Sequence, residues 1–233
     1  MSHDASHPAH LAHHFDSPEQ QNQSSSLGMW LFLAQEVMFF GGLFVAYAVY
    51  RFKYADAFAV ASGHLSLFWG AVNTVVLICS SLTMALAVRC GQLGDKRGII
   101  RYVVATMILA SVFLGIKGLE YAHKYEDQLV PGPQFEYVPD FDSYSVPVTA
   151  ETADPNFAGH VQLFYSFYFV MTGLHALHMV IGLGLMVWLI VKAAKNHFSS
   201  EYYTPVEMTG LYWHFVDIVW IFLFPLVYLV WRH

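Results

Sequence analysis

One carboxylate lies deep inside a long apolar stretch. Glu36 falls within the run from Leu27 to Tyr50, LGMWLFLAQEVMFFGGLFVAYAVY. A helix that crosses a bilayer needs roughly 20 apolar residues, each adding about 1.5 Å, and this run is long enough. Because a carboxylate in hydrocarbon must be protonated, paired or turned toward a protein interior, it indicates a functional group. The alternative is that Glu36 only hydrogen-bonds a neighbouring helix and orders the bundle.

Four further ionisable side chains lie within apolar stretches: His175, His178, His214 and Asp217. If the helices that hold Glu36, His214 and Asp217 enter the membrane from the same side, these three groups lie at comparable depth, within roughly 10 Å of one boundary. A contact of Glu36 with His214 or with Asp217 is therefore one hypothesis. Either contact would change the proton affinity of the carboxylate.

The two histidines of the fourth apolar stretch are candidates for a haem or metal site. His175 and His178 are three residues apart, on one helix face near the middle of their span. Two histidines on successive turns of one helix point the same way, whereas axial haem ligands come from opposite sides of the ring. We therefore interpret them as hydrogen-bonded packing residues. The chain has no CxxCH, phosphate-loop or HExxH motif, so we expect no catalytic residue, no metal site and no cofactor bound by this chain.

The third apolar stretch ends with a lysine and a glutamate three residues apart, Lys117 and Glu120. This spacing puts them on one helix face, so we expect them to pair as their side chains snorkel toward the membrane interface. We predict a structural role for this interfacial pair.

The composition is typical of a polytopic membrane protein. Of the 233 residues, 56% are hydrophobic and 12% are charged, and the mean hydropathy is +0.44. The apolar residues form long blocks separated by polar punctuation. We predict an all-α fold, a membrane helix bundle of residues 27–233 behind a flexible, histidine-rich tail, 1–26. The five predicted transmembrane helices are 27–50, 67–88, 99–121, 163–191 and 211–231.

Two polar segments lie outside the predicted spans. The tail has no Lys or Arg before Leu27, which argues against a cleavable signal peptide, and we expect it to bind metal only weakly and incidentally. The loop 122–160 is strongly acidic; it is either a solvated segment or a docking surface for a basic partner. The tail histidines are His3, His7, His10, His13 and His14, and the acidic residues of the loop are Glu126, Asp127, Glu136, Asp140, Asp142, Glu151 and Asp154.

An odd number of spans places the two termini on opposite sides of the membrane. The short loops on the N-terminal side carry the basic residues that the positive-inside rule counts, so we expect a cytoplasmic N-terminus, with the C-terminus and the acidic loop outside. The basic residues of the N-terminal side are Arg89, Lys96, Arg97, Arg101, Lys192 and Lys195, and those of the other side are Arg51, Lys53, Lys117, Lys124 and Arg232.

Four stretches carry a combined signature. YWHFVDIVWIFLFPLVY spans Tyr212 to Tyr228, and FVMTGLHALHMVIG spans Phe169 to Gly182. WLFLAQEVMFFGGLF runs from Trp30 to Phe44, and KGLEYAHKY from Lys117 to Tyr125 is a looser match. The first three resemble, in this order, the last helix, the helix before it and the glutamate-bearing helix of cytochrome c oxidase subunit III, a component of the haem-copper oxidases. The likeness covers essentially Leu27 to Trp231.

The resemblance implies an all-helical subunit without metal or haem that packs against the catalytic subunit I and subunit II of an oxidase, which hold the haem and copper. It also implies a structural phospholipid in a cleft between helices, and support for assembly, proton uptake and the lifetime of the active enzyme during aerobic electron transport. Glu36 would be the family's reactive intramembrane carboxylate. The family's supporting motif residues would be His175, His178, His214 and Asp217.

The chain departs from the family pattern at two places. Many members have seven spans, and the two that would come first are absent here, which points to a five-span form in a bacterial cytoplasmic (inner) membrane. The long acidic loop is not required by the family pattern, and we predict that it contacts a neighbouring subunit or a cytochrome c domain.

Several alternatives remain open at this stage. Cytochrome c is the expected electron donor, but the equivalent subunit of a quinol oxidase or of a nitric oxide reductase system shares the same helices. A free-standing dihaem cytochrome would show a Soret band on the purified single chain. A proton-coupled transporter built around Glu36 would transport alone in vesicles. We expect no nucleic-acid partner.

Overall fold

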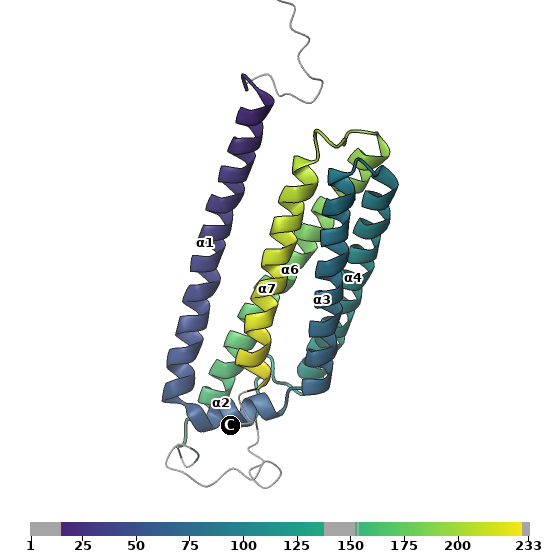
Figure 1. The fold of residues 1–233 in the computed structure, drawn as a ribbon. Coiled ribbons are helices and arrows are strands. Elements are labelled where there is room, and N and C mark those ends of the chain that lie inside the picture. Colours follow the sequence, from purple (N-terminus) through teal and green to yellow (C-terminus); the bar gives the residue numbers. More distant parts are fainter. Residues whose placement is uncertain (1–14, 138–151, 153, 230–233) are drawn as a thin grey trace, which may run out of the picture.

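In the part of the chain that the structure describes, five long helices run roughly side by side as a bundle, and a short helix lies at one end (Figure 1). The structure is a computed structural model, and it describes residues 15–137, 152 and 154–229. The tail histidines and the acidic residues Asp140, Asp142 and Glu151 lie outside the described residues. The helices are α1 (Pro18–Lys53), α2 (Ala55–Gly63), α3 (Leu67–Gln92), α4 (Lys96–Glu126), α6 (Phe157–Ala194) and α7 (Thr204–Tyr228).

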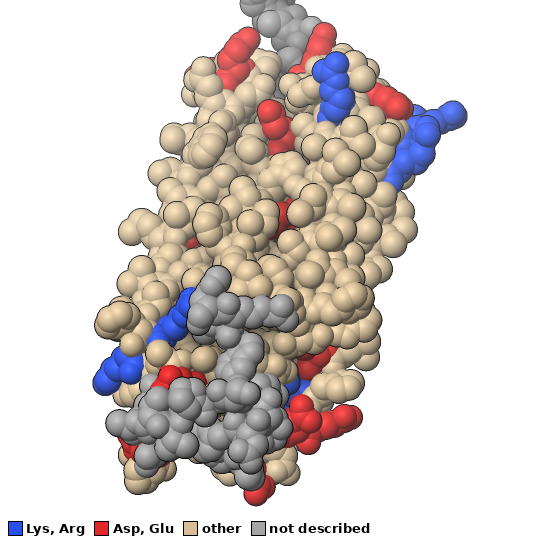
Figure 2. Space-filling view, turned by 60° about the horizontal axis from the view of Figure 1, so that its bottom comes forward, with Lys and Arg blue, Asp and Glu red and all other residues tan. Residues whose placement is uncertain are grey.

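All helices except α2 are long and apolar enough to cross a membrane, so the predicted all-α architecture with five candidate spans is confirmed. Figure 2 shows basic and acidic side chains gathered toward the two ends of the visible face, with a band between them that is almost free of them. A band of this kind is what a hydrocarbon layer about 30 Å thick requires of the surface that it covers. The described chain enters α1 at one end of the bundle and leaves α7 at the other (Figure 1).

Several helices extend beyond the apolar runs that predicted them. α1 begins at Pro18 because Ser17 caps it, its side chain accepting a hydrogen bond from the amide of Gln20 at 3.2 Å, and because proline suits the first helical position. α6 and α7 likewise begin before their predicted spans, at Phe157 and Thr204. Polar residues continue a helix past the hydrocarbon, where apolar run length gives no signal.

The helices pack unevenly. α3 packs most extensively on α4 and then on α7, and α6 packs on both α4 and α7. α3 and α4 are joined by a tight turn in which Gly94 has a φ of +70°, a conformation that favours glycine. α1 stands apart from this group over much of its length in Figure 1, and its principal neighbour is α7. A cavity lies between α1, α6 and α7.

Candidate functional site

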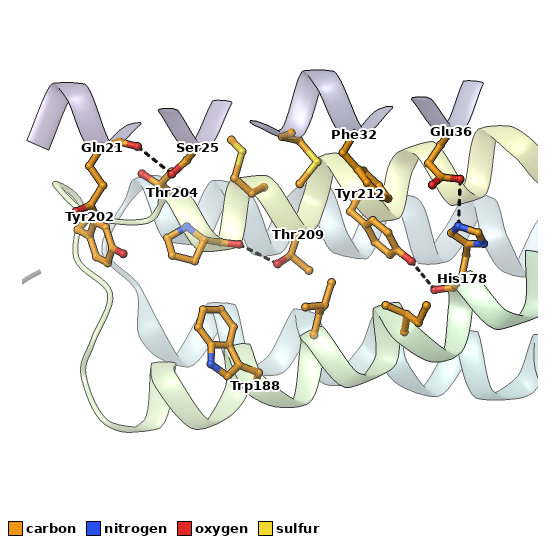
Figure 3. Close-up of a pocket in the computed structure, with 15 residues that line it drawn as sticks. Gln21, Ser25, Phe32, Glu36, His178, Trp188, Tyr202, Thr204, Thr209 and Tyr212 are labelled. Carbon is orange, nitrogen blue, oxygen red and sulfur yellow. Dashed lines mark hydrogen bonds and ion pairs between the residues drawn. The ribbon is translucent and has the colours of Figure 1, made fainter. Parts of the chain in front are cut away.

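The central carboxylate pairs with a histidine of another helix. Glu36 lies near the midpoint of α1 with only 8% of its surface exposed, and its Oε2 is 3.3 Å from Nε2 of His178 on α6 (Figure 3). The His178 ring also packs edge-on against Phe40, one turn after Glu36 on α1. Glu36 is therefore held inside the protein, against the fourth predicted span.

The ring nitrogens of His178 restrict where protons lie. Nδ1 is 2.8 Å from the backbone carbonyl of Leu174, and because a carbonyl only accepts, Nδ1 carries a hydrogen. Nε2 therefore faces Glu36 either as an acceptor for a protonated carboxyl group or as the second donor of an imidazolium beside a carboxylate. These two arrangements differ only in which side chain holds the proton, so its transfer between them requires no change in net charge. The 3.3 Å contact itself lacks the geometry of a regular hydrogen bond.

The predicted contact of Glu36 with His214 or Asp217 is wrong. His214 Nδ1 is instead 2.8 Å from the Ser81 hydroxyl of α3, and Asp217 lies in the same region between α3 and α7. Although α6 runs in the opposite direction to α1 and α7, it carries His178 at the depth of Glu36.

A cavity of about 650 Å³ opens beside the pair, bounded by α1, α6 and α7. Glu36 and His178 lie at one end of the lining side chains in Figure 3, and Gln21, Ser25 and Tyr202 lie at the other. Most of the remaining lining is apolar, with Thr204 and Thr209 as further polar groups; the apolar lining consists of Met29, Phe32, Ile181, Leu185, Trp188, Pro205, Met208 and Tyr212. A long apolar space with polar groups at one mouth suits an amphipathic molecule.

Tyr212 joins the wall of this cavity to the pair. Its hydroxyl donates to the backbone carbonyl of His178 at 2.8 Å, and its ring lies 5.9 Å from that of Phe32. Sequence reasoning missed this residue as a site component. A tyrosine inside an apolar span is the available signal, because a buried hydroxyl needs a hydrogen-bond partner.

His175 and His178 do not face the same neighbour. His175 is almost fully buried and packs against Phe113 of α4 and Trp220 of α7, with ring centroids 5.5 and 5.2 Å away. Neither of its ring nitrogens has a hydrogen-bond partner among the described residues. The three-residue offset turns the two rings far enough apart to meet different helices, so they do not form one ligand set.

Lys117 and Glu120 pair as predicted, at 3.0 Å, and their charged groups lie inside the bundle. Lys117 is 4% exposed, and its Nζ also donates to the hydroxyls of Tyr168 at 3.1 Å and Tyr228 at 2.7 Å. Both hydroxyls in turn donate to Oε1 of Glu120, at 2.9 and 2.6 Å. We call these four residues the Lys117 cluster. It ties α4, α6 and α7 together, so the lysine is satisfied locally and has no need to snorkel.

The ligand chemistry of a resident metal is not assembled in the described part of the chain. No group of three or more His, Cys, Asp or Glu side chains is placed there to share an ion. The candidate functional residues are Glu36 and His178, which lie beside a mostly apolar cavity of a polytopic helical membrane protein.

Sequence comparisons identify the family. A model of cytochrome c oxidase subunit III matches residues 145–233. The cytochrome c oxidase subunit 3 proteins of Thermostichus vulcanus and Corynebacterium diphtheriae are each 30% identical over 207 residues, 88% of this chain and 87% of theirs. A probable quinol oxidase subunit 3 of Staphylococcus haemolyticus is 25% identical over 224 residues, 95% of this chain and 96% of its own. The chain belongs to the cytochrome c oxidase subunit III family, the subunit III of haem-copper oxidases.

Proposed function

We propose that this protein is the non-catalytic third subunit of a respiratory haem-copper oxidase, in which it stabilises the catalytic subunit, binds lipid and supports proton uptake. The observation that carries the proposal is the similarity to proteins named cytochrome c oxidase subunit 3 over 88% of the chain. The partners would be subunits I and II, which supply the haem and copper chemistry. Cytochrome c is the proposed donor of the assembled complex.

Glu36 is the proposed functional carboxylate. A proton can pass between Glu36 and His178 without leaving a net charge in hydrocarbon, where an unpaired charge is costly, because the carboxyl–imidazole and the carboxylate–imidazolium forms are both neutral overall. The pair borders the cavity of α1, α6 and α7, so a proton reaching the cavity has an acceptor at its inner end. His175 supports the bundle through its contacts with Phe113 and Trp220.

The same cavity is the proposed phospholipid site. Its volume of about 650 Å³ and its mostly apolar lining suit acyl chains, and the hydroxyl and amide groups near Gln21, Ser25 and Thr204 suit a polar headgroup. A lipid there would fill the space beside α1, which packs on the remaining helices less closely than they pack on one another. It would also exclude water from Glu36.

The proposed location is the cytoplasmic membrane of a bacterium, with the N-terminus inside and the 122–160 loop outside. The distribution of basic residues in the short loops supports this orientation. The loop would contact a neighbouring subunit or a cytochrome c domain. Deleting 128–155 is expected to lower complex assembly or cytochrome c turnover, and unchanged values for both would contradict this role.

The decisive experiment is a pull-down through this chain in mild detergent, followed by an optical spectrum of the eluate and of the chain expressed alone. We expect haem only in the eluate that contains large partner subunits, and we expect that eluate to consume oxygen. Haem on the single chain would instead indicate a membrane cytochrome. A colourless chain without partners that moves protons in vesicles would indicate a transporter.

The second candidate is the equivalent subunit of a quinol oxidase. The observation that favours this candidate is the 25% identity to a probable quinol oxidase subunit 3 across 95% of the chain. Turnover of the purified complex with reduced cytochrome c against turnover with a quinol separates the two donors.

A further inference from the structure

A second set of polar side chains lines a groove that shares no residue with the Glu36 cavity. A groove of about 430 Å³ runs between α3 and α7, which lie side by side in Figure 1. Its polar residues are Ser81, His214 and Asp217, all near the midpoints of their helices. Its apolar residues are Leu77, Ile78, Leu82, Ala85, Ile218 and Ile221.

The carboxyl group of Asp217 is the unusual feature of this groove. The residue is only 4% exposed, yet neither of its oxygens has a hydrogen-bond partner among the described residues. Ser81 is a close polar neighbour, but its contact with the carboxyl group lacks the geometry of a regular hydrogen bond, and its hydroxyl also lies 2.8 Å from His214 Nδ1. A buried polar group without a partner is costly in either protonation state.

A further hydrogen-bond donor beside Asp217 would relieve this cost, and a partner chain can supply one. Acyl chains offer no hydrogen-bond donor, so lipid in the groove would leave the carboxyl group unsatisfied. A side chain with a hydroxyl, amide, indole or guanidinium group would satisfy it. At the middle of the membrane such a side chain is carried most readily by another spanning helix.

The shape of the groove suits a helix. Ser81 and Ala85 are four residues apart on α3, a spacing of small residues that lets a neighbouring helix approach closely. Large apolar side chains form the rims, with Leu82 61% and Ile218 50% exposed. Small residues in the groove with apolar ridges on either side resemble the packing surface of a helix pair.

The geometry points to the α3–α7 groove as the docking site for a transmembrane helix of another oxidase subunit, one that donates a hydrogen bond to Asp217. This inference rests on the proposed function, because it requires a partner subunit. Two surfaces of the molecule would then bind different partners. The cavity at α1 has its carboxylate already paired with His178 and suits lipid, whereas the groove has an unpaired carboxyl group and suits protein.

Photo-crosslinking in intact membranes tests this inference. A benzophenone amino acid is placed at Leu82 or at Ile218, and at Ile108 of α4 as a control whose 59% exposure matches that of Leu82. We expect the two groove positions to link to a spanning segment of a haem-bearing subunit, and mass spectrometry to map the link within one turn of a hydrogen-bond donor. The Ile108 position is expected to link mainly to lipid.

Links from the groove only to lipid or to a second copy of this chain, in membranes from which the oxidase co-purifies, would overturn the docking site and leave the proposed function intact. Failure of any haem-bearing subunit to co-purify would overturn the proposed function and this inference with it. The haem spectrum of the eluate distinguishes the two results.

Substitution of Asp217 gives a second readout. Asp217→Leu removes the unsatisfied group, so the chain on its own should unfold at an unchanged or higher temperature, while its retention by the oxidase in detergent should fall roughly tenfold. Asp217→Asn keeps a hydrogen-bonding side chain, so the oxidase should retain this variant better than it retains Asp217→Leu. Equal retention of both variants and the unsubstituted chain would contradict the inference, as would a loss of thermal stability alone.

Discussion

The Lys117 cluster and the Glu36–His178 pair use similar charged groups but differ in how completely those groups are satisfied. In the Lys117 cluster a lysine, a carboxylate and two tyrosine hydroxyls from three helices satisfy one another through five contacts of 2.6–3.1 Å. Glu36 has one ionisable neighbour, His178, at 3.3 Å, and its Oε2 makes no regular hydrogen bond among the described residues. The pair also borders a cavity of about 650 Å³.

We expect this difference to separate a structural group from a group that changes its protonation. A closed network of buried polar groups is rigid, because any change leaves a charge or hydroxyl unpaired. A pair that shares a single proton beside a cavity can change its state when the cavity content changes. We therefore expect substitutions in the Lys117 cluster to lower stability, and substitutions in the pair to alter the activity of the complex.

The largest effect is expected for Lys117→Met. The change leaves Glu120 buried at the end of α4 without its cation, and loss of one partner from a buried ion pair costs about 3–5 kcal/mol. The free energy of unfolding in mild detergent measures it. In the double variant Lys117→Met/Glu120→Gln the amide still accepts from Tyr168 and Tyr228, so much of the loss should be recovered. Equal losses in both variants would show that the ion pair is not what holds the three helices.

Tyr228→Phe is expected to have the next largest effect. The hydroxyl donates to Glu120 at 2.6 Å and accepts from Lys117 at 2.7 Å, and hydrogen bonds to charged groups contribute about 1.5–3 kcal/mol. Tyr47→Phe is the matched control, because its buried hydroxyl donates only to the neutral carbonyl of Leu226 and should cost about 1 kcal/mol. A larger loss at Tyr47 than at Tyr228 in the same unfolding measurement would contradict the role given to the cluster.

Gly182→Ala tests whether packing positions the region around the pair. Gly182 lies one turn after His178 on α6, and a Cβ there would be 2.7 Å from the Trp213 ring and 3.2 Å from the Tyr212 ring. Trp213 is fully buried and donates to Ser80 at 2.8 Å, so it cannot move freely. We expect a loss of about 1–3 kcal/mol in unfolding free energy. Gly184→Ala, where nothing lies within 4 Å, should be neutral, and similar values for both would remove the packing argument.

The sequence predicts the bundle well because each helix that crosses the hydrocarbon needs a run of roughly 20 apolar residues. Five runs of sufficient length predict five helices, and the spacing of Lys117 and Glu120 predicts their contact because both lie on one helix. The short helix α2 was not predicted, since nine residues carry no spanning signal. Spacing along the sequence thus predicts helices and the side-chain contacts within one helix.

Contacts between helices were harder to predict. The partner of Glu36 depends on which helix lies beside α1 at mid-depth, and five spans allow many arrangements. The same holds for Tyr168 and Tyr228, whose hydroxyls complete the Lys117 cluster from α6 and α7. Their presence within apolar runs indicates that each hydroxyl has a partner, but run length and periodicity do not say on which helix that partner lies.

The smallest effect on stability is expected for Glu36→Gln, and this variant separates the two regions most sharply. The amide has the shape of the carboxyl group and can still meet His178, so the unfolding free energy should change by less than about 1 kcal/mol. The amide cannot share a titratable proton, however, so proton uptake and the number of turnovers before inactivation of the assembled oxidase should fall. Glu36→Asp, which keeps the proton but shortens the side chain, should retain part of both activities. If Glu36→Gln instead unfolds the chain as readily as Lys117→Met and leaves turnover unchanged, the pair is structural like the Lys117 cluster, and the functional carboxylate lies elsewhere.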